Sequence, residues 1–222
     1  MSRAPWPVGL LFGLALVVII GLLGPLALFN PWTTGLLQSR HEVPAALGST
    51  PADVDRLTTA FLTDIYAGGS FDAPLGDADE PFLDADERSH MQDVSALVRT
   101  LAVILIVALL VALVTGAWLR REPARIGRIM LLSAGLVGAV AVVLALAFAL
   151  AFDAAFTAFH ELFFPPGTWQ FALGSNLITL FPEPFWFDAA LLSGTSILLV
   201  AALVSLVGLR AWREGRASSA AT

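Results

Sequence analysis

Residues 95–119 read SALVRTLAVILIVALLVALVTGAWL, a run of 25 residues in which Arg99 carries the only charge. An α-helix needs about 20 apolar residues to cross the roughly 30 Å hydrocarbon core of a bilayer. A chain in lipid must also satisfy its backbone hydrogen bonds internally, as a helix does. This run therefore predicts a membrane-spanning helix.

Three further stretches have the same apolar character, and the four together set the expected fold class. They cover residues 8–29, 129–152 and 189–209. The 222-residue chain is 57% hydrophobic and 14% charged, whereas soluble domains are about half apolar and about a quarter charged. This composition argues against a conventional soluble enzyme and against disorder. We therefore expect an all-α, polytopic membrane protein with four transmembrane helices.

The arginines predict how these helices are oriented, because loops on the cytoplasmic side of a membrane are enriched in basic residues. All 12 basic residues are arginines. Eight of them flank the spans on one side: Arg3, Arg120, Arg121, Arg125, Arg128, Arg210, Arg213 and Arg216. Both termini should therefore be cytoplasmic. The first apolar stretch is too long for a cleavable signal peptide, so we expect it to remain as an anchor.

We expect a single membrane domain over residues 1–222, with two outer segments that form an extracytoplasmic helical cap. The expected parts are, in order, a span at 8–29, an outer loop at 30–94 with an amphipathic helix at about 51–66, a span at 95–119, an inner turn at 120–128, a span at 129–152, an outer helix and lid at 153–188, a span at 189–209 and a cytoplasmic tail at 210–222. The first outer loop carries 12 of the 18 acidic residues, which we interpret as a solvated face.

This first outer loop contains two helix signals. Thr50 followed by Pro51 and Asp53 is typical of a helix start. The apolar residues that follow share one stripe at helical spacing: Val54, Leu57, Phe61, Leu62 and Ile65. This helix should lie either along the bilayer surface or against the outer ends of the spans. A second helix should begin near Asp84 or Asp86 and continue without a break into the second span.

The second outer segment is apolar but holds no span of its own. Four of its residues recur at helical spacing: Phe156, Phe159, His160 and Phe163. The third span should therefore continue outward as an amphipathic helix until Pro165 stops it. Pro182 and Pro184 argue against a regular helix further on, so we expect an irregular aromatic lid over an enclosed pocket.

The three histidines are the strongest candidates for chemistry. His41 lies in a loop with no helical partner, so we expect it to be solvated. His90 and His160 each lie just outside a span, on the same side of the membrane and on helices that continue a span. Ionisable groups so near to lipid are costly and are functional candidates for that reason. Asp93 and Glu161 are close to them in sequence, although each histidine taken alone also fits a hydrogen-bonded interfacial anchor.

Several other kinds of site find no support in the sequence. The chain has no cysteine, which excludes disulfides, thiolate metal sites and cysteine nucleophiles. It has no Gly-x-Ser-x-Gly elbow, no Walker loop and no His-Glu-x-x-His. A zinc site formed by the two outer histidines and their neighbouring acids would lack any zinc spacing signature. We therefore expect no metal, no cofactor and no nucleic-acid partner.

Around the histidines the sequence is similar to a known family. Residues 82–94 read FLDADERSHMQDV and resemble the signature E-x-x-H-x-x-D-V of a bacterial family of four-span membrane proteins. Residues 159–164 read FHELFF and, with Trp169 and residues 181–186 (FPEPFW), resemble its second signature, F-H-x-x-F-F…W…F-P-E-x-F. This family is that of the lipoprotein intramolecular transacylase, Lit.

The resemblance implies an acyltransferase that acts on lipoproteins in the bacterial plasma membrane. Such enzymes move the sn-2 acyl chain of diacylglyceryl-cysteine onto the N-terminal amine and leave a lyso-lipid. The resemblance makes His90 and His160 the catalytic candidates, at a site facing outward, with contact to membrane lipid and no cofactor. Around them we expect supporting acids and an aromatic pocket or lid: Asp93, Glu87, Glu161, Phe156, Phe163, Trp169, Phe171, Phe181, Phe185 and Trp186.

The chemistry of imidazole suits such a reaction. An α-amine has a pKa of about 8 and is mostly protonated at neutral pH. One histidine would take its proton, and the other would protonate the departing oxygen or hold the developing oxyanion. We expect the two imidazoles to lie about 4–8 Å apart, a gap that one ester group can bridge. Two alternatives stay open: a lipid ester hydrolase that uses the same histidine pair, and a non-catalytic membrane partner or envelope sensor.

Overall fold

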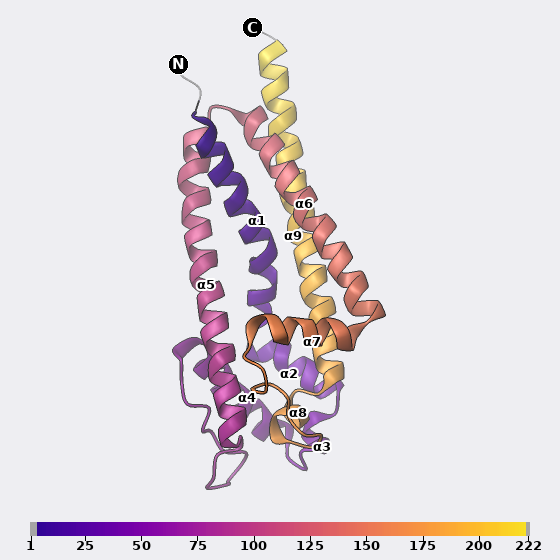
Figure 1. The fold of residues 1–222 in the computed structure, drawn as a ribbon. Helices are drawn as coiled ribbons and strands as arrows, with labels where there is room; N and C mark the ends of the chain where they lie inside the picture. The colour runs from indigo at the N-terminus through magenta and orange to yellow at the C-terminus, as the bar shows by residue number, and fades with distance from the viewer. Residues whose placement is uncertain (1–3, 221–222) are drawn as a thin grey trace. The chain divides into compact units, whose positions relative to one another are not determined.

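The computed structural model describes residues 4–220, so Arg3 and the last two residues of the expected tail lie outside the described residues. The described chain is helical and contains no strand. Its elements are α1 (Trp6–Leu28), α2 (Pro31–Arg40), α3 (Val43–Ala46), α4 (Pro51–Ala67), α5 (Ala85–Leu119), α6 (Pro123–Leu150), α7 (Phe152–Phe163), α8 (Asn176–Leu180) and α9 (Glu183–Ala220). Four of them, α1, α5, α6 and α9, are long and apolar enough to cross a membrane. The expected all-α fold with four membrane-spanning helices is therefore confirmed (Figure 1).

The chain divides into two compact units, which we call the bundle unit and the site unit. The bundle unit comprises Met1–Pro25, Ala102–Ala145 and Ser193–Thr222, and the site unit comprises Leu26–Leu101 and Leu146–Leu192. Each unit has its own apolar core. The four long helices contribute turns to both units, whereas His90 and His160 both lie in the site unit.

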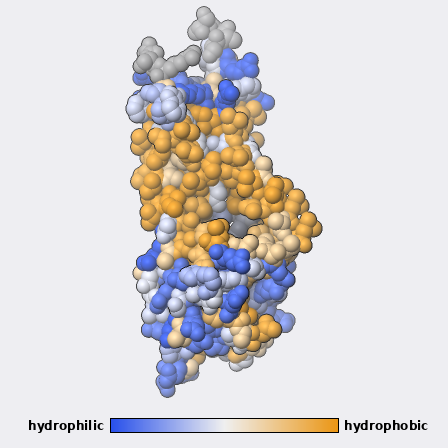
Figure 2. Space-filling view, in the orientation of Figure 1, coloured by the Kyte–Doolittle hydropathy of each residue, from blue (hydrophilic) through white to orange (hydrophobic). Residues whose placement is uncertain are grey.

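The bundle unit is held together by small residues as well as by large apolar ones. Its core includes Phe12, Leu16 and Ile20 of α1, which pack with residues of the other spans. At Gly127 of α6 the backbone of α9 comes so close that an added Cβ would collide with the carbonyl oxygen of Gly208. Close approach at small residues is a common basis of helix association in membranes. Many large apolar side chains of this unit remain exposed, and Figure 2 shows them as an apolar surface suited to lipid.

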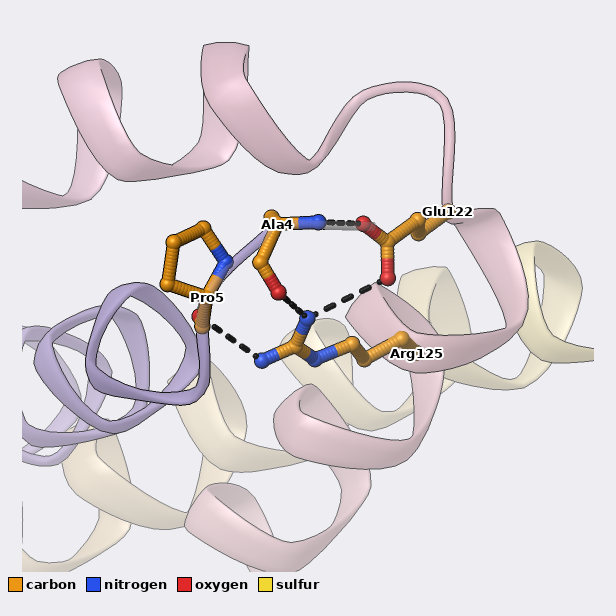
Figure 3. Close-up of polar contacts among 4 residues, drawn as sticks. All are labelled: Ala4, Pro5, Glu122 and Arg125. Atoms are coloured by element: carbon orange, nitrogen blue, oxygen red, sulfur yellow. Dashed lines mark hydrogen bonds and ion pairs between the residues drawn. The ribbon is translucent and has the colours of Figure 1, made fainter. Parts of the chain in front are cut away.

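A polar contact fastens the start of α1 to the start of α6 within the bundle unit (Figure 3). The N–H of Ala4 donates to Glu122 Oε1 at 2.6 Å. Arg125 Nη1 donates to Ala4 O at 2.7 Å and to Glu122 Oε2 at 3.2 Å. Its Nη2 donates to Pro5 O at 3.2 Å. Arg125, which the sequence marks only as a basic residue flanking a span, therefore also holds Ala4 and Pro5, just before α1, in place.

In the site unit, α4 supplies much of the core. Thr50 Oγ1 accepts a hydrogen bond from the Asp53 N–H at 3.2 Å, and Gly68 ends the helix at φ +75°, a conformation that favours glycine. The predicted apolar stripe of this helix is buried along its whole length. It packs with residues of α5 and α8. Of the two places considered for this helix, the structure shows the one in which the stripe is covered by protein.

Two short helices, α2 and α3, lie where the sequence predicted only loop. Asn30 caps α2 by accepting a hydrogen bond from the Thr33 N–H at 3.0 Å. Gln38 of α2 is buried, accepts from the Thr58 hydroxyl at 2.9 Å and donates to Leu180 O at 3.3 Å. These bonds join α2 to α4 and to the end of α8. An asparagine followed by a proline is a helix-start signal that the sequence analysis did not use.

The prediction of a solvated His41 is wrong. Its Nε2 lies 3.0 Å from Asp188 Oδ2, and its side chain is only 19% exposed. Arg40 Nε lies 3.1 Å from the same carboxylate oxygen. The partner lies far along the chain, at the start of α9, so no local pattern around His41 indicates the contact.

Two helix boundaries in the second outer segment differ from the expectation. The third span does not continue outward, because α6 ends at Leu150 and Ala151 has a non-helical backbone (φ −150°, ψ 59°). A separate helix, α7, begins at Phe152. Helical periodicity runs through both helices, so the pattern cannot reveal the break. The fourth span begins earlier than expected, at Glu183, since Pro184 lies in the first turn, where a missing N–H costs nothing.

Candidate active site

His90 lies near the start of α5, which begins with a reciprocal capping box. The N–H of Glu87 donates to Asp84 Oδ1 at 2.8 Å, and the N–H of Asp84 donates to Glu87 Oε2 at 3.0 Å. The other carboxylate oxygen of Glu87 accepts from the Leu177 N–H at 2.8 Å. Glu87 is 1% exposed. It therefore fixes the turn that carries His90 and ties α8 to it.

His160 lies in the last turn of α7, where a carbonyl group of its own helix binds one ring nitrogen. Its Nδ1 lies 2.8 Å from the carbonyl oxygen of Phe156. Because a carbonyl oxygen can only accept, Nδ1 carries the proton, and the neutral ring keeps its lone pair on Nε2. The site therefore contains a nitrogen, His160 Nε2, that is prepared to take a proton.

The two histidines face each other within an aromatic cluster. Their ring centroids lie 6.1 Å apart with an interplanar angle of 26°. The ring of His90 is 4.9 Å from that of Phe164 and 5.6 Å from that of Phe171. The ring of His160 is 4.8 Å from that of Trp169. The two imidazoles are therefore close enough for one small group to contact both rings.

Burial in this cluster changes the proton affinity of both rings. His90 precedes the apolar run of α5 at residues 95–119, and His160 lies on α7, which is not one of the four long apolar helices. Desolvation, with a further contribution from the nearby His160, lowers the pKa of His90 to about 4. Desolvation also lowers the pKa of His160, partly opposed by its bond to Phe156 O. Both imidazoles are therefore neutral at pH 7 and able to accept or share a proton.

Two buried polar atoms of the cluster lack a hydrogen-bond partner. Across the described residues, the unpaired buried side-chain atoms are His90 Nδ1 and Trp169 Nε1. Leaving a buried donor or acceptor unpaired costs about 1–3 kcal/mol. Buried polar groups in native proteins are nearly always paired, so such exceptions call for an explanation. A bound molecule with its own donor and acceptor groups would supply the missing partners.

Comparison with known proteins identifies the family. Residues 49–186, which include both histidines, match the model of the family described as lipoprotein intramolecular transacylase Lit. The chain belongs to this family. A search of curated proteins gave no match.

The fold of this Lit-family chain is similar to that of the membrane-integral lipoprotein intramolecular transacylase Lit from Bacillus cereus. An in meso structure of that protein matches with a TM-score of 0.83 at 19% sequence identity, covering 95% of this chain and 96% of that chain. Structures of the same protein with a histidine replaced by arginine or by alanine match with a TM-score of 0.76 at 19% identity, covering 96% and 93%, and 95% and 94%, respectively. With the four apolar helices, this similarity shows a multi-pass membrane protein.

The acids expected near the Lit-type histidines lie in different surroundings. Asp93 does not bind His90 Nδ1, which has no partner. It lines an open groove of about 290 Å³ together with Ala96, Leu97, Thr100, Phe163 and Pro165. Glu161 is exposed on α7. Within the part of the chain that the structure describes, no group of three His, Cys, Asp or Glu side chains is arranged to hold a metal.

Six of the seven expected aromatic residues fall into two groups, and the seventh, Phe163, lines the open groove. Phe156, Trp169 and Phe171 contact a histidine ring. Phe181, Phe185 and Trp186 instead pack on one another around the start of α9, with ring centroids 5.2–5.9 Å apart.

One aromatic residue of the site was missed by the sequence analysis. Phe164 lies 4.9 Å from the His90 ring and 5.5 Å from the His160 ring. The helical spacing favoured Phe163, but α7 ends there, and the extended backbone of Phe164 (φ −127°, ψ 146°) places its ring against both histidines. The double phenylalanine before two prolines was the available signal.

Proposed function

We propose that this protein is a lipoprotein transacylase that moves the sn-2 acyl chain of a diacylglyceryl-cysteine onto the α-amine of the same cysteine. The observation that carries the proposal is the pair of neutral imidazoles 6.1 Å apart, one of which has a buried, unpaired nitrogen. Membership of the Lit family and the similarity to the Bacillus cereus enzyme support it. The site faces the outside of the bacterial plasma membrane, following the arginine distribution.

The reaction begins with the neutral α-amine beside the sn-2 ester. The amine nitrogen attacks the carbonyl carbon, a C–N bond forms, and the C=O electron pair moves onto the carbonyl oxygen. His160 Nε2 takes the proton that this nitrogen loses. The oxyanion then collapses, the bond to the sn-2 oxygen breaks, and that oxygen leaves with the electron pair and receives the proton from His160. The product is an amide and a free sn-2 hydroxyl, with no atom gained or lost.

His90 assists at the leaving oxygen. Its pKa of about 4 makes it a weak base at neutral pH, so it is less suited than His160 to accept the amine proton. With its proton on Nδ1, it donates a hydrogen bond to the sn-2 oxygen as negative charge develops there. This assignment gives the buried Nδ1 the partner that the free protein lacks.

The groove beside the histidines suits the rest of the substrate. Asp93 is one turn along α5 from His90, and Phe163 is one turn along α7 from His160. The carboxylate of Asp93 attracts the peptide's N-terminal amine, and Leu97 and Phe163 offer apolar contact to an acyl chain. The groove is open, in contrast to the enclosed pocket expected from the sequence, so a lipid substrate enters it from the bilayer. Holding amine and ester together supplies much of the rate acceleration.

The decisive experiment follows a synthetic diacylglyceryl lipopeptide with ¹³C in the sn-2 acyl carbonyl. The wild-type protein in detergent should move the label from ester to amide without any change in substrate mass, as read by tandem mass spectrometry. Release of a labelled fatty acid would instead show a hydrolase. No conversion under conditions in which the protein is folded and binds the lipopeptide would show a non-catalytic partner or sensor.

Three asparagine or glutamine variants assign the roles. His160→Asn keeps a donor for Phe156 O but removes the Nε2 base, so conversion should fall by about 10²–10⁴-fold. His90→Asn places an amide donor where Nδ1–H was and should retain more activity than His90→Ala. His41→Gln is the matched control and should keep wild-type turnover. It replaces a histidine that contacts Asp188 by a side chain that still offers a donor to that carboxylate. Wild-type turnover by His160→Asn would overturn the proposal.

A further inference from the structure

Trp169 brings to the histidine cluster a hydrogen-bond donor that the reaction steps above do not use. Its indole ring lies 4.8 Å from the His160 ring with an interplanar angle of 33°. Its Nε1 is buried and has no partner. An indole N–H can only donate, so the missing partner must be an acceptor such as an oxygen atom. That acceptor has to lie next to His160.

The chain is built to hold this indole in place. Thr168 N–H and Oγ1 both bind Pro165 O, at 3.3 and 2.9 Å. Pro166 and Gly167 occupy the middle of this turn, and Gly167 has φ +83°, which favours glycine. The tight turn after α7 reverses the chain and sets Trp169 on the face of His160. The donor is thus positioned by the backbone before any substrate binds.

The proposed reaction needs a donor at one more place. When the amine attacks, the carbonyl oxygen of the migrating acyl group becomes negatively charged. His160 Nε2 is engaged with the amine proton and His90 with the leaving oxygen, so neither donates to the carbonyl oxygen. The preorganised donors that stabilise an oxyanion are usually a large part of such catalysis.

We propose that Trp169 Nε1–H donates a hydrogen bond to the carbonyl oxygen of the migrating acyl ester and stabilises the oxyanion formed on attack. This inference rests on the proposed transacylase function and adds a catalytic residue to it. The electron pair of the C=O bond resides on that oxygen in the intermediate and returns when the bond to the sn-2 oxygen breaks. Trp169 gains and loses no proton in the cycle.

The test is the Trp169→Phe variant, which keeps an aromatic ring against His160 and removes only the N–H. We expect kcat to fall about 10²–10³-fold while KM changes little, because the bond strengthens mainly in the transition state. Trp32→Phe is the matched control, since Trp32 is 76% exposed on α2. An unchanged kcat in Trp169→Phe would overturn the inference.

A second measurement separates a catalytic from a structural role. A lipopeptide with a phosphonate in place of the sn-2 ester carbonyl imitates the tetrahedral oxyanion. Trp169→Phe should weaken its Kd by about the same factor as kcat/KM falls, and should leave the Kd of the lyso-amide product unchanged. Equal weakening for both ligands would show that Trp169 only shapes the pocket.

Should Trp169→Phe fail to fold, benzothienylalanine at position 169 replaces the N–H by sulfur and preserves the bicyclic shape. Loss of turnover with this residue supports the inference, and wild-type turnover contradicts it. The proposed function is tested independently by His160→Asn. If that variant is inactive while Trp169→Phe has a normal kcat, the transacylase stands and the role of Trp169 is wrong. If His160→Asn is fully active, the proposed function itself fails.

Discussion

Arg125 of the bundle unit and His90 of the site unit are both polar side chains with apolar neighbours. They differ in their hydrogen bonding, because Arg125 has several partners and one ring nitrogen of His90 has none. Arg125 donates to Ala4 O, Pro5 O and Glu122 Oε2, so its charge is met by acceptors of the same unit (Figure 3). His90 is 6% exposed, and its Nδ1 has no partner. The first arrangement stabilises a fold. The second leaves binding capacity for another molecule at a cost in stability.

The strongest test of this contrast compares the effects of two substitutions on turnover and on stability. His90→Ala should reduce turnover by about 10²–10⁴-fold. It should change the thermal midpoint little, because the cavity it leaves is offset by removal of an unpaired buried atom. Arg125→Ala should lower the free energy of unfolding by about 1–3 kcal/mol and leave turnover per folded molecule unchanged. Thermal unfolding in detergent and the lipopeptide assay measure both, and the reverse pattern would refute the contrast.

Acid should act on the site unit through His90. Its pKa is about 4 in the folded protein and about 6.5 in an unfolded chain. The unfolded chain therefore binds more protons between these values, and stability is complete above pH 6.5 and lost as the pH falls towards 4. The loss should reach about 3 kcal/mol. The unfolding midpoints of wild type and His90→Ala, similar at pH 7, should diverge as the pH falls to 4, because only the wild type carries this loss. Parallel curves would contradict the assignment.

Tight packing should make the bundle unit sensitive to added volume. In Gly127→Ala the new methyl group would meet the α9 backbone at Gly208 and Trp212. Separating the two helices should cost about 1–3 kcal/mol. Gly135→Ala on the same helix is the control, because no atom lies within 4 Å of its added Cβ. Equal midpoints for the two variants would show that α6 and α9 do not pack this closely.

The smallest expected effect concerns the cap of α4 in the site unit. Thr50→Ala removes the acceptor for the Asp53 N–H and should cost about 1 kcal/mol. Thr50→Ser retains the hydroxyl and should be close to wild type. Denaturant midpoints measure the difference. Turnover per folded molecule should be the same in both variants, because Thr50 caps α4 and the two histidines lie on α5 and α7.

Local patterns predicted much of the helical plan. The apolar run at 95–119 requires a helix in lipid whatever surrounds it, and the cap and stripe after Thr50 predicted α4 closely. The break at Ala151 escaped prediction because both flanking helices share one period. The contact between His41 and Asp188 escaped it because the two residues are 147 positions apart.

The candidate site shows the same division. The sequence indicated that His90 and His160 lie outside spans on one side of the membrane. It could not indicate which nitrogen of His160 is protonated, since that follows from the bond to Phe156 O. The sequence identified Glu87 as an acid of the family signature. It could not predict that Glu87 accepts a hydrogen bond from the Leu177 N–H, because the two residues are 90 positions apart.

The sequence alone determined the membrane-crossing helices, because lipid imposes helical hydrogen bonding on every long apolar run. It also determined which side chains are candidates for the chemistry. The tertiary structure set the relation between side chains on different elements: imidazoles 6.1 Å apart, an indole packed against one of them at a tilt of 33°, and two buried nitrogens without partners. Such relations depend on how distant segments pack, and packing is a property of the assembled chain rather than of any local stretch.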